Sequence, residues 1–351
     1  MTYTIEKVTT LIGARRYGDN DTNIGFILTD SRSLCFPEET LFFALKSERN
    51  DGHNYIPELY RRGVKNFVVT DVPKGYASDY PEANFLKVVN TLEALQRLAE
   101  RHRDEFNIPI VGITGSNGKT MVKEWLYQLL SPSMFVTRSP RSYNSQIGVP
   151  LSVWLMNEQT QVGVFEAGIS QPGEMLALRD IIQPTIAVLT NVGSAHQENF
   201  SSLEEKCREK LILFHDAETV VYDGDDEVIT KVVAEYPDYK GEKLFWSLQN
   251  PEAPFYVKKI EKQQSVSVVI YIYKGVEDSF SIPFIDDASI QNSIICAAVA
   301  SKIGLSAEDI DKRMAQLEPA ALRPAAQPGP HRRPPLPDTY NTHTHPPHLP
   351  P

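Results

Sequence analysis

The stretch Ile108-Pro-Ile-Val-Gly-Ile-Thr-Gly-Ser-Asn-Gly-Lys-Thr120 decides the fold class of this chain. Its first half is an apolar, β-branched run that suits a buried strand and is too short for a helix. Gly112, Gly115 and Gly118 then allow a tight turn that aims backbone N–H groups at an anion. An apolar helix face follows, made by Val122, Trp125, Leu126, Leu129 and Leu130. The pattern predicts a strand, a phosphate-binding loop and a helix whose N-terminus favours phosphate.

The loop from Gly115 through Ser116, Asn117 and Gly118 to Lys119 and Thr120 is therefore a candidate phosphate-binding site. Lys119 is expected to reach the outer phosphates, and the Thr120 hydroxyl to bind Mg²⁺. A strict phosphate loop has glycine five residues before Gly118, and this chain has Ile113 there. The loop is thus a variant, and a purely structural turn stays open as the alternative.

Composition sets the broad class. A chain of 351 residues is long enough for two or three domains, and 41% hydrophobic with 23% charged residues is ordinary for a globular protein. No run approaches the ~20 apolar residues of a membrane span, and the start lacks a signal-peptide pattern, so a cytoplasmic protein is expected. Three widely spaced cysteines favour reduced thiols. A net charge of −10 argues against nucleic acid as a partner.

The chain is expected to form an α/β protein in three parts. Residues 1–107 form a small α/β domain, residues 108–317 a central domain with a doubly wound parallel sheet and an added hairpin, and residues 318–351 a Pro/His-rich, disordered tail. The expected strands are 26–29, 41–45, 66–70, 85–89, 108–113, 162–166, 185–190, 219–222, 265–273 and 279–284, and the expected helices are 55–62, 91–105, 203–215 and 290–303.

Polar residues at the ends of central-domain strands are candidate site residues, because ligands of open α/β sheets gather there. Glu166 follows one such run, and His196 lies in a segment that follows another. Together with Thr120 they could form a magnesium site. The alternatives are a helix cap for Glu166 and a hydrogen-bonded loop residue for His196. Lys210 lies near the edge of the apolar face of a helix, where most lysines are solvated.

In the first domain, Thr29-Asp-Ser-Arg32 ends a strand and Asn50-Asp-Gly-His53 forms a turn. Such backbone turns can hold a diphosphate or uracil, with Arg32 as a charged donor. An Asp-Gly pair is also an ordinary turn signal, and spacing alone favours that second interpretation.

These residues resemble the Mur ligases of peptidoglycan synthesis over residues 5–323. The likeness is greatest to members that add D-Ala-D-Ala to UDP-MurNAc-tripeptide, of the kind fused to an alanine racemase. Their variant loop Thr-Gly-x-x-Gly-Lys-Thr matches Thr114–Thr120. The other matches, in the same order, are Asp30-Ser-Arg32, Phe43-Ala-Leu, Asp51-Gly-His53, Asn144-Ser-Gln-Ile-Gly-Val-Pro150, Glu166-Ala-Gly, Pro172-Gly-Glu174, Asn191-Val-Gly-Ser-Ala-His196 and Lys210.

The resemblance implies an ATP-dependent amide ligase whose cofactors are ATP and Mg²⁺. Ser31 and Arg32 would contact the UDP part of the substrate, and Asn144 the muropeptide. Lys119 would act on the phosphates, with Thr120 and Glu166 on one Mg²⁺ and His196 on a second. Lys210 matches the lysine that is carbamylated in this family and then supports that second ion.

Three positions depart from the family pattern. Asn292 matches an asparagine close to the adenine, but Ala288-Ser289 replaces the usual His-Asn, and Ser145 replaces the second asparagine after Asn144.

The family's third domain binds the incoming amine substrate, and only 28 residues follow Arg323. We therefore expect that domain to be essentially missing and the chain to be weakly active or inactive. Asp338-Thr-Tyr-Asn341 resembles its opening motif. A racemase domain would lie further downstream in the full-length protein. Two alternatives stay open: a non-catalytic nucleotide-binding module, and another ligase of the group, such as a second muropeptide ligase or a folylpolyglutamate synthase.

Overall fold

The computed structural model describes residues 1–193, 199–236 and 239–319. The first compact unit is Met1–Leu95, and the second begins at Gln96. This division falls inside helix α4 (Thr91–Arg103), whereas the sequence placed a boundary at 107–108, beyond the end of that helix. None of the helices in the described ranges has the length and apolar character needed to span a bilayer.

The first unit contains a five-stranded sheet in the order β2-β7-β6-β5-β4. Strands β4 to β7 run parallel and β2 runs antiparallel to β7. The strands are β2 (Arg15–Tyr17), β4 (Phe26–Leu28), β5 (Thr40–Phe43), β6 (Asn66–Val69) and β7 (Asn84–Lys87), with a separate pair β1 (Tyr3–Thr4) and β3 (Asn23–Ile24). The helices are α1 (Ile5–Ile12), α2 (Ile56–Arg61) and α3 (Tyr76–Asp79). The core includes Phe42, Phe67 and Phe85.

The second unit contains a nine-stranded sheet in the order β16-β15-β14-β13-β12-β11-β8-β10-β9. Neighbouring strands from β9 to β14 are parallel, and β15 and β16 add an antiparallel hairpin. The strands are β8 (Ile110–Thr114), β9 (Val136–Arg138), β10 (Val162–Glu166), β11 (Ile186–Leu189), β12 (Thr219–Asp223), β13 (Glu242–Ser247), β14 (Phe255–Lys262), β15 (Ser267–Tyr273) and β16 (Val276–Ile282).

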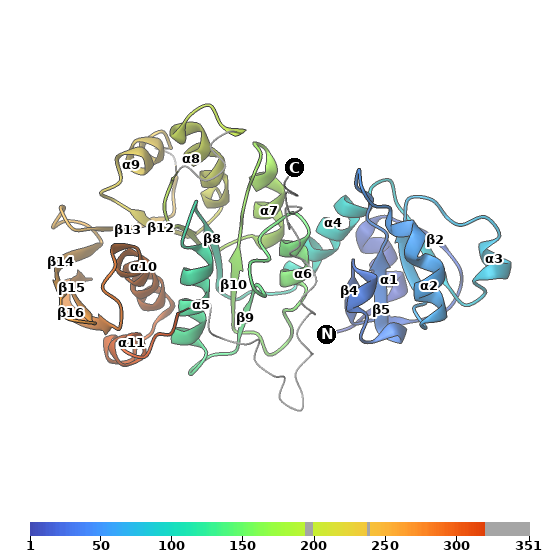
Figure 1. Cartoon of the computed structure of the whole chain (residues 1–351), viewed down its shortest axis with the longest axis horizontal. Coiled ribbons are helices and arrows are strands. Elements are labelled where there is room, and N and C mark those ends of the chain that lie inside the picture. Colours follow the sequence, from blue (N-terminus) through green and yellow to red (C-terminus); the bar gives the residue numbers. More distant parts are fainter. Residues whose placement is uncertain (194–198, 237–238, 320–351) are drawn as a thin grey trace, which may run out of the picture. The chain divides into compact units, whose positions relative to one another are not determined.

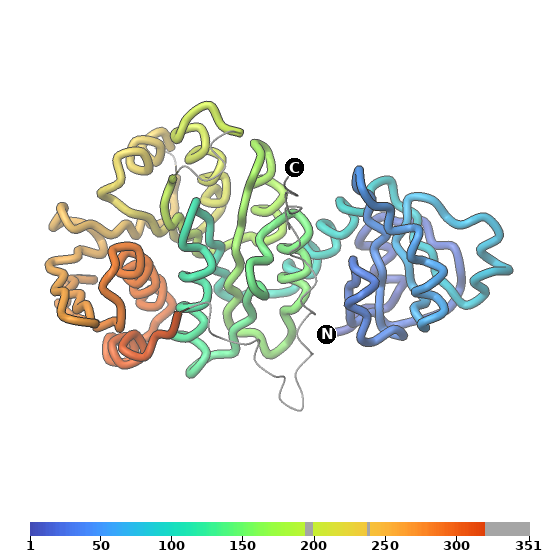
Figure 2. Tube along the Cα trace, in the orientation of Figure 1, coloured from blue at the N-terminus to red at the C-terminus, as the bar shows by residue number. Residues whose placement is uncertain are grey.

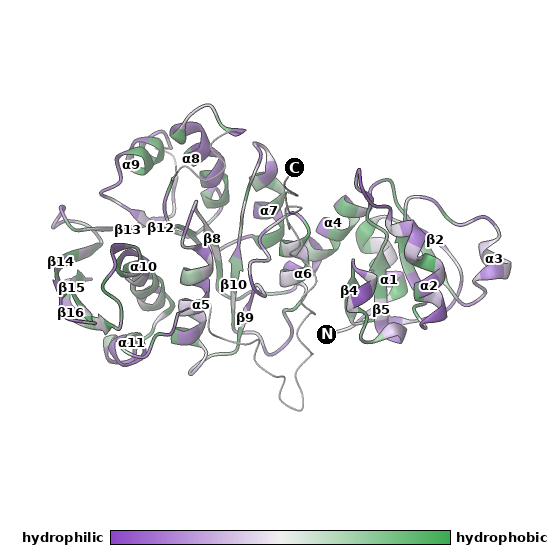
Figure 3. Cartoon of the chain, in the orientation of Figure 1, coloured by the Kyte–Doolittle hydropathy of each residue, from purple (hydrophilic) through white to green (hydrophobic). Residues whose placement is uncertain are grey.

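Helices cover both faces of this sheet (Figure 1). Alternate residues of a strand point to opposite faces, so Val111 packs with one set of helices and its neighbour Ile110 with the other. The first set is α5 (Lys119–Leu130), α10 (Asp287–Ile303) and α11 (Ala307–Met314), and the second is α6 (Gly148–Val153), α7 (Glu174–Ile182), α8 (Leu203–Leu211) and α9 (Glu227–Ala234). Apolar residues mark the strands between the two helix layers (Figure 3).

Strand β8 lies where the winding of the sheet reverses. The chain leaves β8 through α5 to the edge strand β9, returns to β10 beside β8, and then crosses to β11 on the other side of β8, a path that Figure 2 follows by colour. Such a switch point opens a crevice at the carboxyl ends of the strands. The glycine loop after β8 lies at this point.

The α/β class, the doubly wound sheet, the predicted strands and the hairpin are confirmed. The short strands β1, β2, β3 and β9 were not predicted, and neither were β13 and β14. Polar residues interrupt β13 and β14, as in Phe-Tyr-Val-Lys-Lys-Ile-Glu-Lys of β14, because these strands lie nearer the hairpin side of the sheet and expose part of their length. The predicted tail from residue 318 lies outside the described ranges beyond residue 319.

Candidate active site

The glycine loop has the backbone shape that the sequence predicted. Gly118 has φ +82° and caps the N-terminus of α5, and Gly115 has φ +145°. A side chain at Gly115 would collide with the Thr190 hydroxyl, and one at Gly118 would lie 2.6 Å from Asn292 Oδ1. Both positions therefore need glycine for backbone conformation and for space.

Hydrogen bonds fasten the loop to the segment that follows β11. Ser116 N–H donates to the Asn191 carbonyl and Asn117 N–H to Asn191 Oδ1, each at 3.0 Å. Gly193 N–H donates to Ser116 Oγ at 2.9 Å, and Thr190 Oγ1 donates to the Asn117 carbonyl at 2.5 Å. The side chain of Asn191 thus accepts from one backbone N–H of the loop and helps to fix its shape.

Three lysine side chains gather behind the loop. Lys119 Nζ donates to the Gly115 carbonyl at 2.7 Å, and Lys210 Nζ donates to the same oxygen at 3.2 Å. Lys206 Nζ donates to the Gly193 carbonyl at 2.5 Å. Burial, and then the charges of Lys119 and Lys206, lower the pKa of Lys210 to about 7. Burial also lowers the pKa of Lys119, which the carboxylate of Glu166 partly offsets.

Glu166, the last residue of β10, is fully buried. The Thr120 hydroxyl donates to Glu166 Oε2 at 3.1 Å, and Asn144 Nδ2 lies 3.5 Å from the same oxygen. Lys123 Nζ forms an ion pair with Oε1 at 3.0 Å. The next helix, α7, is capped by Gly173, so Glu166 is not the helix cap that the sequence left open.

The oxygen atoms of Thr120 and Glu166 suit a magnesium ion, which prefers hydroxyl, carboxylate and phosphate oxygens. Glu166 Oε1 is buried and, despite its ion pair, accepts no hydrogen bond of regular geometry, so it has capacity for another partner. In the described ranges no three His, Cys, Asp or Glu residues cluster as metal ligands. Magnesium that arrives with a nucleotide needs only one or two carboxylates from the protein.

A cavity of about 180 Å³ adjoins these groups. It brings together the loop, Asn144 and Lys210, which come from segments far apart in the sequence. Its lining consists of Gly115, Ser116, Lys119, Asn144, Ser145, Gly168, Ile169, Ser170 and Lys210. Lys210 is therefore a buried cavity residue and not a solvated surface lysine.

The remaining predicted residues lie in three places. Asn292 on α10 lies against Gly118, at the end of the loop. His196 lies outside the described residues. Ser31 and Arg32 belong to the first unit, in the 3-10 helix η1 (Ser31–Ser33), where Arg32 pairs with Asp30 at 2.6 Å.

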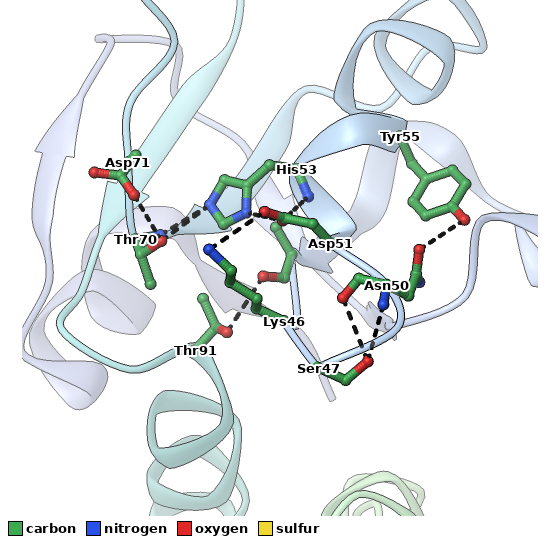
Figure 4. A network of polar contacts seen from close by, with 10 residues as sticks. Lys46, Ser47, Asn50, Asp51, His53, Tyr55, Thr70, Asp71 and Thr91 are labelled. Carbon is green, nitrogen blue, oxygen red and sulfur yellow. Dashed lines mark hydrogen bonds and ion pairs between the residues drawn. The ribbon is translucent and has the colours of Figure 1, made fainter.

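The Asp51-Gly-His53 turn of the first unit holds a polar network (Figure 4). His53 Nε2 accepts the Thr70 N–H at 3.1 Å, so the ring proton is on Nδ1, which donates to Asp51 Oδ1 at 2.7 Å. Both ring nitrogens are engaged in fixing the turn. The backbone and side-chain hydrogen bonds from His53 lower the pKa of Asp51. Beside this turn lies a second cavity, of about 370 Å³.

Sequence reasoning missed Lys123, Lys206 and the role of Asn191. Lys206 is one helical turn before Lys210, so the i, i+4 spacing on one helix face could have indicated it. Lys123 follows Thr120 by one turn in the same way. Nothing in the sequence marks either lysine as buried.

The glycine loop, the N-terminus of α5 and the ammonium groups of Lys119 and Lys210 meet where the sheet reverses, an arrangement that suits a polyanion. The second unit thus has the features of the α/β class that binds nucleotide phosphates through a variant glycine loop. Comparison with known families then narrows that class. Residues 113–300 match the Mur ligase middle domain, and residues 23–103 match the catalytic domain of the Mur ligase family. The chain belongs to the Mur ligase family.

Curated relatives share a specific description. The chain is 28% identical over 309 residues to the UDP-N-acetylmuramoyl-tripeptide–D-alanyl-D-alanine ligase of Bacillus subtilis, covering 86% of this chain and 64% of the relative. It is 34% identical over 235 residues to the Synechocystis protein of the same description, covering 65% of this chain and 50% of that one. The chain thus spans between half and two thirds of these relatives' lengths.

Solved structures of other proteins share the fold of this chain. MurF from Acinetobacter baumannii aligns with a TM-score of 0.82 at 24% identity, covering 92% of this chain and 69% of that one. MurF ligase from Thermotoga maritima, in complex with ADP, aligns with a TM-score of 0.72 at 25% identity, covering 84% of this chain and 66% of that one.

Proposed function

We propose that this chain contributes the substrate-activating machinery of an ATP-dependent amide ligase that adds D-Ala-D-Ala to UDP-MurNAc-tripeptide. The observation that carries the proposal is the cavity at the switch point, where the loop, Lys119, Asn144 and Lys210 meet beside Glu166. The description shared by the curated relatives supports the choice of substrates.

The chemistry has two bond-forming steps. An oxygen of the muropeptide carboxylate attacks the γ-phosphorus of ATP, and ADP leaves, which gives an acyl phosphate. The amine of D-Ala-D-Ala then attacks the acyl carbon, loses a proton and expels inorganic phosphate, which leaves an amide. Positioning and electrostatic stabilisation account for most of the catalysis in such phosphoryl transfers.

The loop residues have assigned parts in this scheme. Gly115, Ser116, Asn117 and Gly118 enclose the phosphates of ATP, and Lys119 moves its ammonium from the Gly115 carbonyl to the outer phosphates. Thr120 and Glu166 would hold a magnesium ion, which neutralises phosphate charge when bound. Asn292 lies against the loop, on the side assigned to the adenine.

Lys210 is assigned as the carbamylated lysine. Carbamylation needs a neutral amine to attack CO₂, and the buried amine of Lys210, close to Lys119 and Lys206, has its pKa lowered to about 7. The carbamate that forms carries a negative charge. It would attract the ammonium groups of Lys119 and Lys206, which the cationic form of Lys210 repels. With His196 it would support a second magnesium ion.

Substrate selection is assigned to Ser31 and Arg32 for the UDP group and to Asn144 for the muropeptide. Asn144 Nδ2 reaches the carboxylate of Glu166 and lines the cavity, so it has a donor near the reacting groups. Arg32 holds Asp30 and would exchange that partner for a diphosphate.

Trapping the acyl phosphate with hydroxylamine tests the proposal without the amine substrate. UDP-MurNAc-tripeptide and ATP are expected to give a hydroxamate and ADP, and Lys119→Met is expected to abolish both. The full reaction with D-Ala-D-Ala is followed by mass spectrometry of the UDP-muropeptide. A folate substrate and shorter muropeptides complete the panel. Activation of one of these in preference to the tripeptide would overturn the assignment, as would nucleotide binding with no hydroxamate from any substrate.

A further inference from the structure

Lys123 is a buried cation that the proposed chemistry does not use. Its side chain is fully buried on α5, one turn after Thr120. The ammonium donates to the Arg141 carbonyl and lies 3.1 Å from Glu124 Oε1 and 3.0 Å from Glu166 Oε1. A buried ammonium is costly unless acceptors surround it, and three acceptors surround this one.

The two carboxylates around Lys123 are not equivalent. Arg138 holds Glu124 through Nε, at 3.1 and 3.2 Å, and through Nη2 at 3.0 Å. Arg138 and Lys123 together lower the pKa of Glu124 against the opposing effect of burial. Glu124 therefore already has a dedicated cation, which leaves the charge of Lys123 available to Glu166.

Lys119 is a second cation that interacts with Glu166, because the Glu166 carboxylate acts to raise the pKa of Lys119 against the larger, opposing effect of burial. Two more ammonium groups lie close to Lys119: Lys210 donates to the same Gly115 carbonyl, and the charge of Lys206 acts on Lys119. A divalent cation approaching Glu166 alone would meet several positive charges in a poorly hydrated region, where repulsion is strong. The phosphates of a nucleotide would reverse that balance by supplying negative charge and additional oxygen ligands.

We infer that Lys123 is a positioning residue that neutralises Glu166 until nucleotide binds, so that a divalent cation enters the site only together with nucleotide phosphates. This inference rests on the proposed nucleotide site and adds to it a control over the order of metal binding. Glu124 and Arg138 determine how strongly Lys123 neutralises Glu166, because Glu124 also pairs with Lys123 and Arg138 pairs with Glu124.

The test measures Mn²⁺ binding by electron paramagnetic resonance, with and without a non-hydrolysable ATP analogue. Lys123→Met keeps an unbranched side chain and removes the charge. Without nucleotide, the variant is expected to bind Mn²⁺ more tightly than the parent chain by about tenfold or more. Adding Glu166→Gln to this variant should cancel the gain. Lys231→Met, which removes an exposed lysine paired with Glu204, is the matched control and should change nothing.

Glu124→Gln supplies a second test with the opposite sign, and it remains available if Lys123→Met does not fold. The amide preserves the shape of Glu124 and leaves Glu166 as the main counter-charge of Lys123. With the ATP analogue present, Mn²⁺ affinity is expected to fall several-fold. A purely structural role for Lys123 would lower the stability of both variants without moving metal affinity in opposite directions.

The outcomes separate the two proposals. If the analogue does not bind the parent chain, the nucleotide site itself is wrong. If the analogue binds, but Lys123→Met leaves nucleotide-free Mn²⁺ affinity unchanged, the inference about Lys123 is refuted. Where only Glu124→Gln can be measured, unchanged or tighter Mn²⁺ binding refutes it equally.

Discussion

Replacing Gly118 by alanine tests the geometry of the loop quantitatively, because the chain contains a nearly identical glycine elsewhere. Gly118 caps α5 with φ +82° and ψ −16°, and Gly173 caps α7 with φ +86° and ψ −7°. A Cβ on Gly173 would meet nothing within 4 Å, whereas one on Gly118 would lie 2.6 Å from Asn292 Oδ1. The two substitutions therefore share the backbone cost and differ in the contact with Asn292.

The expected magnitudes follow from this difference. An alanine in the left-handed region costs ~1–2 kcal/mol, and the smaller entropy of the unfolded chain returns ~0.4–1 kcal/mol. Gly173→Ala should thus lower the free energy of unfolding by about 1 kcal/mol. Gly118→Ala adds the displacement of Asn292, for which overpacking typically costs ~1–3 kcal/mol. We expect about 2–4 kcal/mol in total.

Urea unfolding followed by tryptophan fluorescence is the appropriate assay, because Trp125, Trp154 and Trp246 all lie in the second unit. Combining Gly118→Ala with Asn292→Ala removes the obstructing side chain. The double variant should recover most of the extra loss, with a coupling energy of ~1–2 kcal/mol between the sites. Equal losses for Gly118→Ala and Gly173→Ala, or strict additivity with Asn292→Ala, would refute the packing argument.

Three further substitutions should change the free energy of unfolding: one should raise it and two should lower it. Asp223→Asn should stabilise the second unit by ~1 kcal/mol at neutral pH, because burial raises the pKa of Asp223 from 3.8 to about 6. The gain in the free energy of unfolding should fade as pH falls from 6 towards 3.8. A pH-independent effect on urea unfolding would contradict this explanation. Asp51→Ala should lower the free energy of unfolding by ~1 kcal/mol at neutral pH, since Asp51 accepts the backbone N–H of His53 at 3.0 Å and its pKa is lowered. Calorimetry should find this loss above pH 3.8 and not below the lowered pKa of Asp51. An undiminished loss in acid would count against the prediction. Arg103→Met should lower the free energy of unfolding by about 3 kcal/mol, because the buried guanidinium donates to the carbonyls of Ile182 and Gln183 at 3.0 Å. A loss under 1 kcal/mol in the same fluorescence assay would show that those carbonyls find other partners.

Local pattern predicted the parts of the site that are contiguous in sequence. The loop from Gly115 to Thr120 is set by its own glycines, by the strand before it and by the helix after it, so a short stretch was sufficient. Glu166 could be proposed as a site residue because it ends an apolar strand at the edge where ligands gather. The fold class followed from the same alternation of buried strands and helices.

Burial of charged side chains could not be predicted in this way. Helix α8 is rich in charge, yet it buries Lys206 and Lys210, because the loop carbonyls of Gly193 and Gly115 lie above that face. Lys123 is similar, since two of its three acceptors come from Arg141 and from β10. Such positions depend on tertiary contacts, and a sequence pattern treats each of them as a surface lysine.

The Gly115 carbonyl has a consequence for how occupancy of the site could be observed. This one oxygen accepts from both Lys119 and Lys210. Phosphate binding would withdraw the first donor, and carbamylation would convert the second from an ammonium into the single N–H of an anionic carbamate, so each event changes one hydrogen bond to the same atom. A chain labelled with ¹³C at the Gly115 carbonyl would therefore carry a single spectroscopic reporter of both events, whose resonance shifts in two separable steps as the site is loaded.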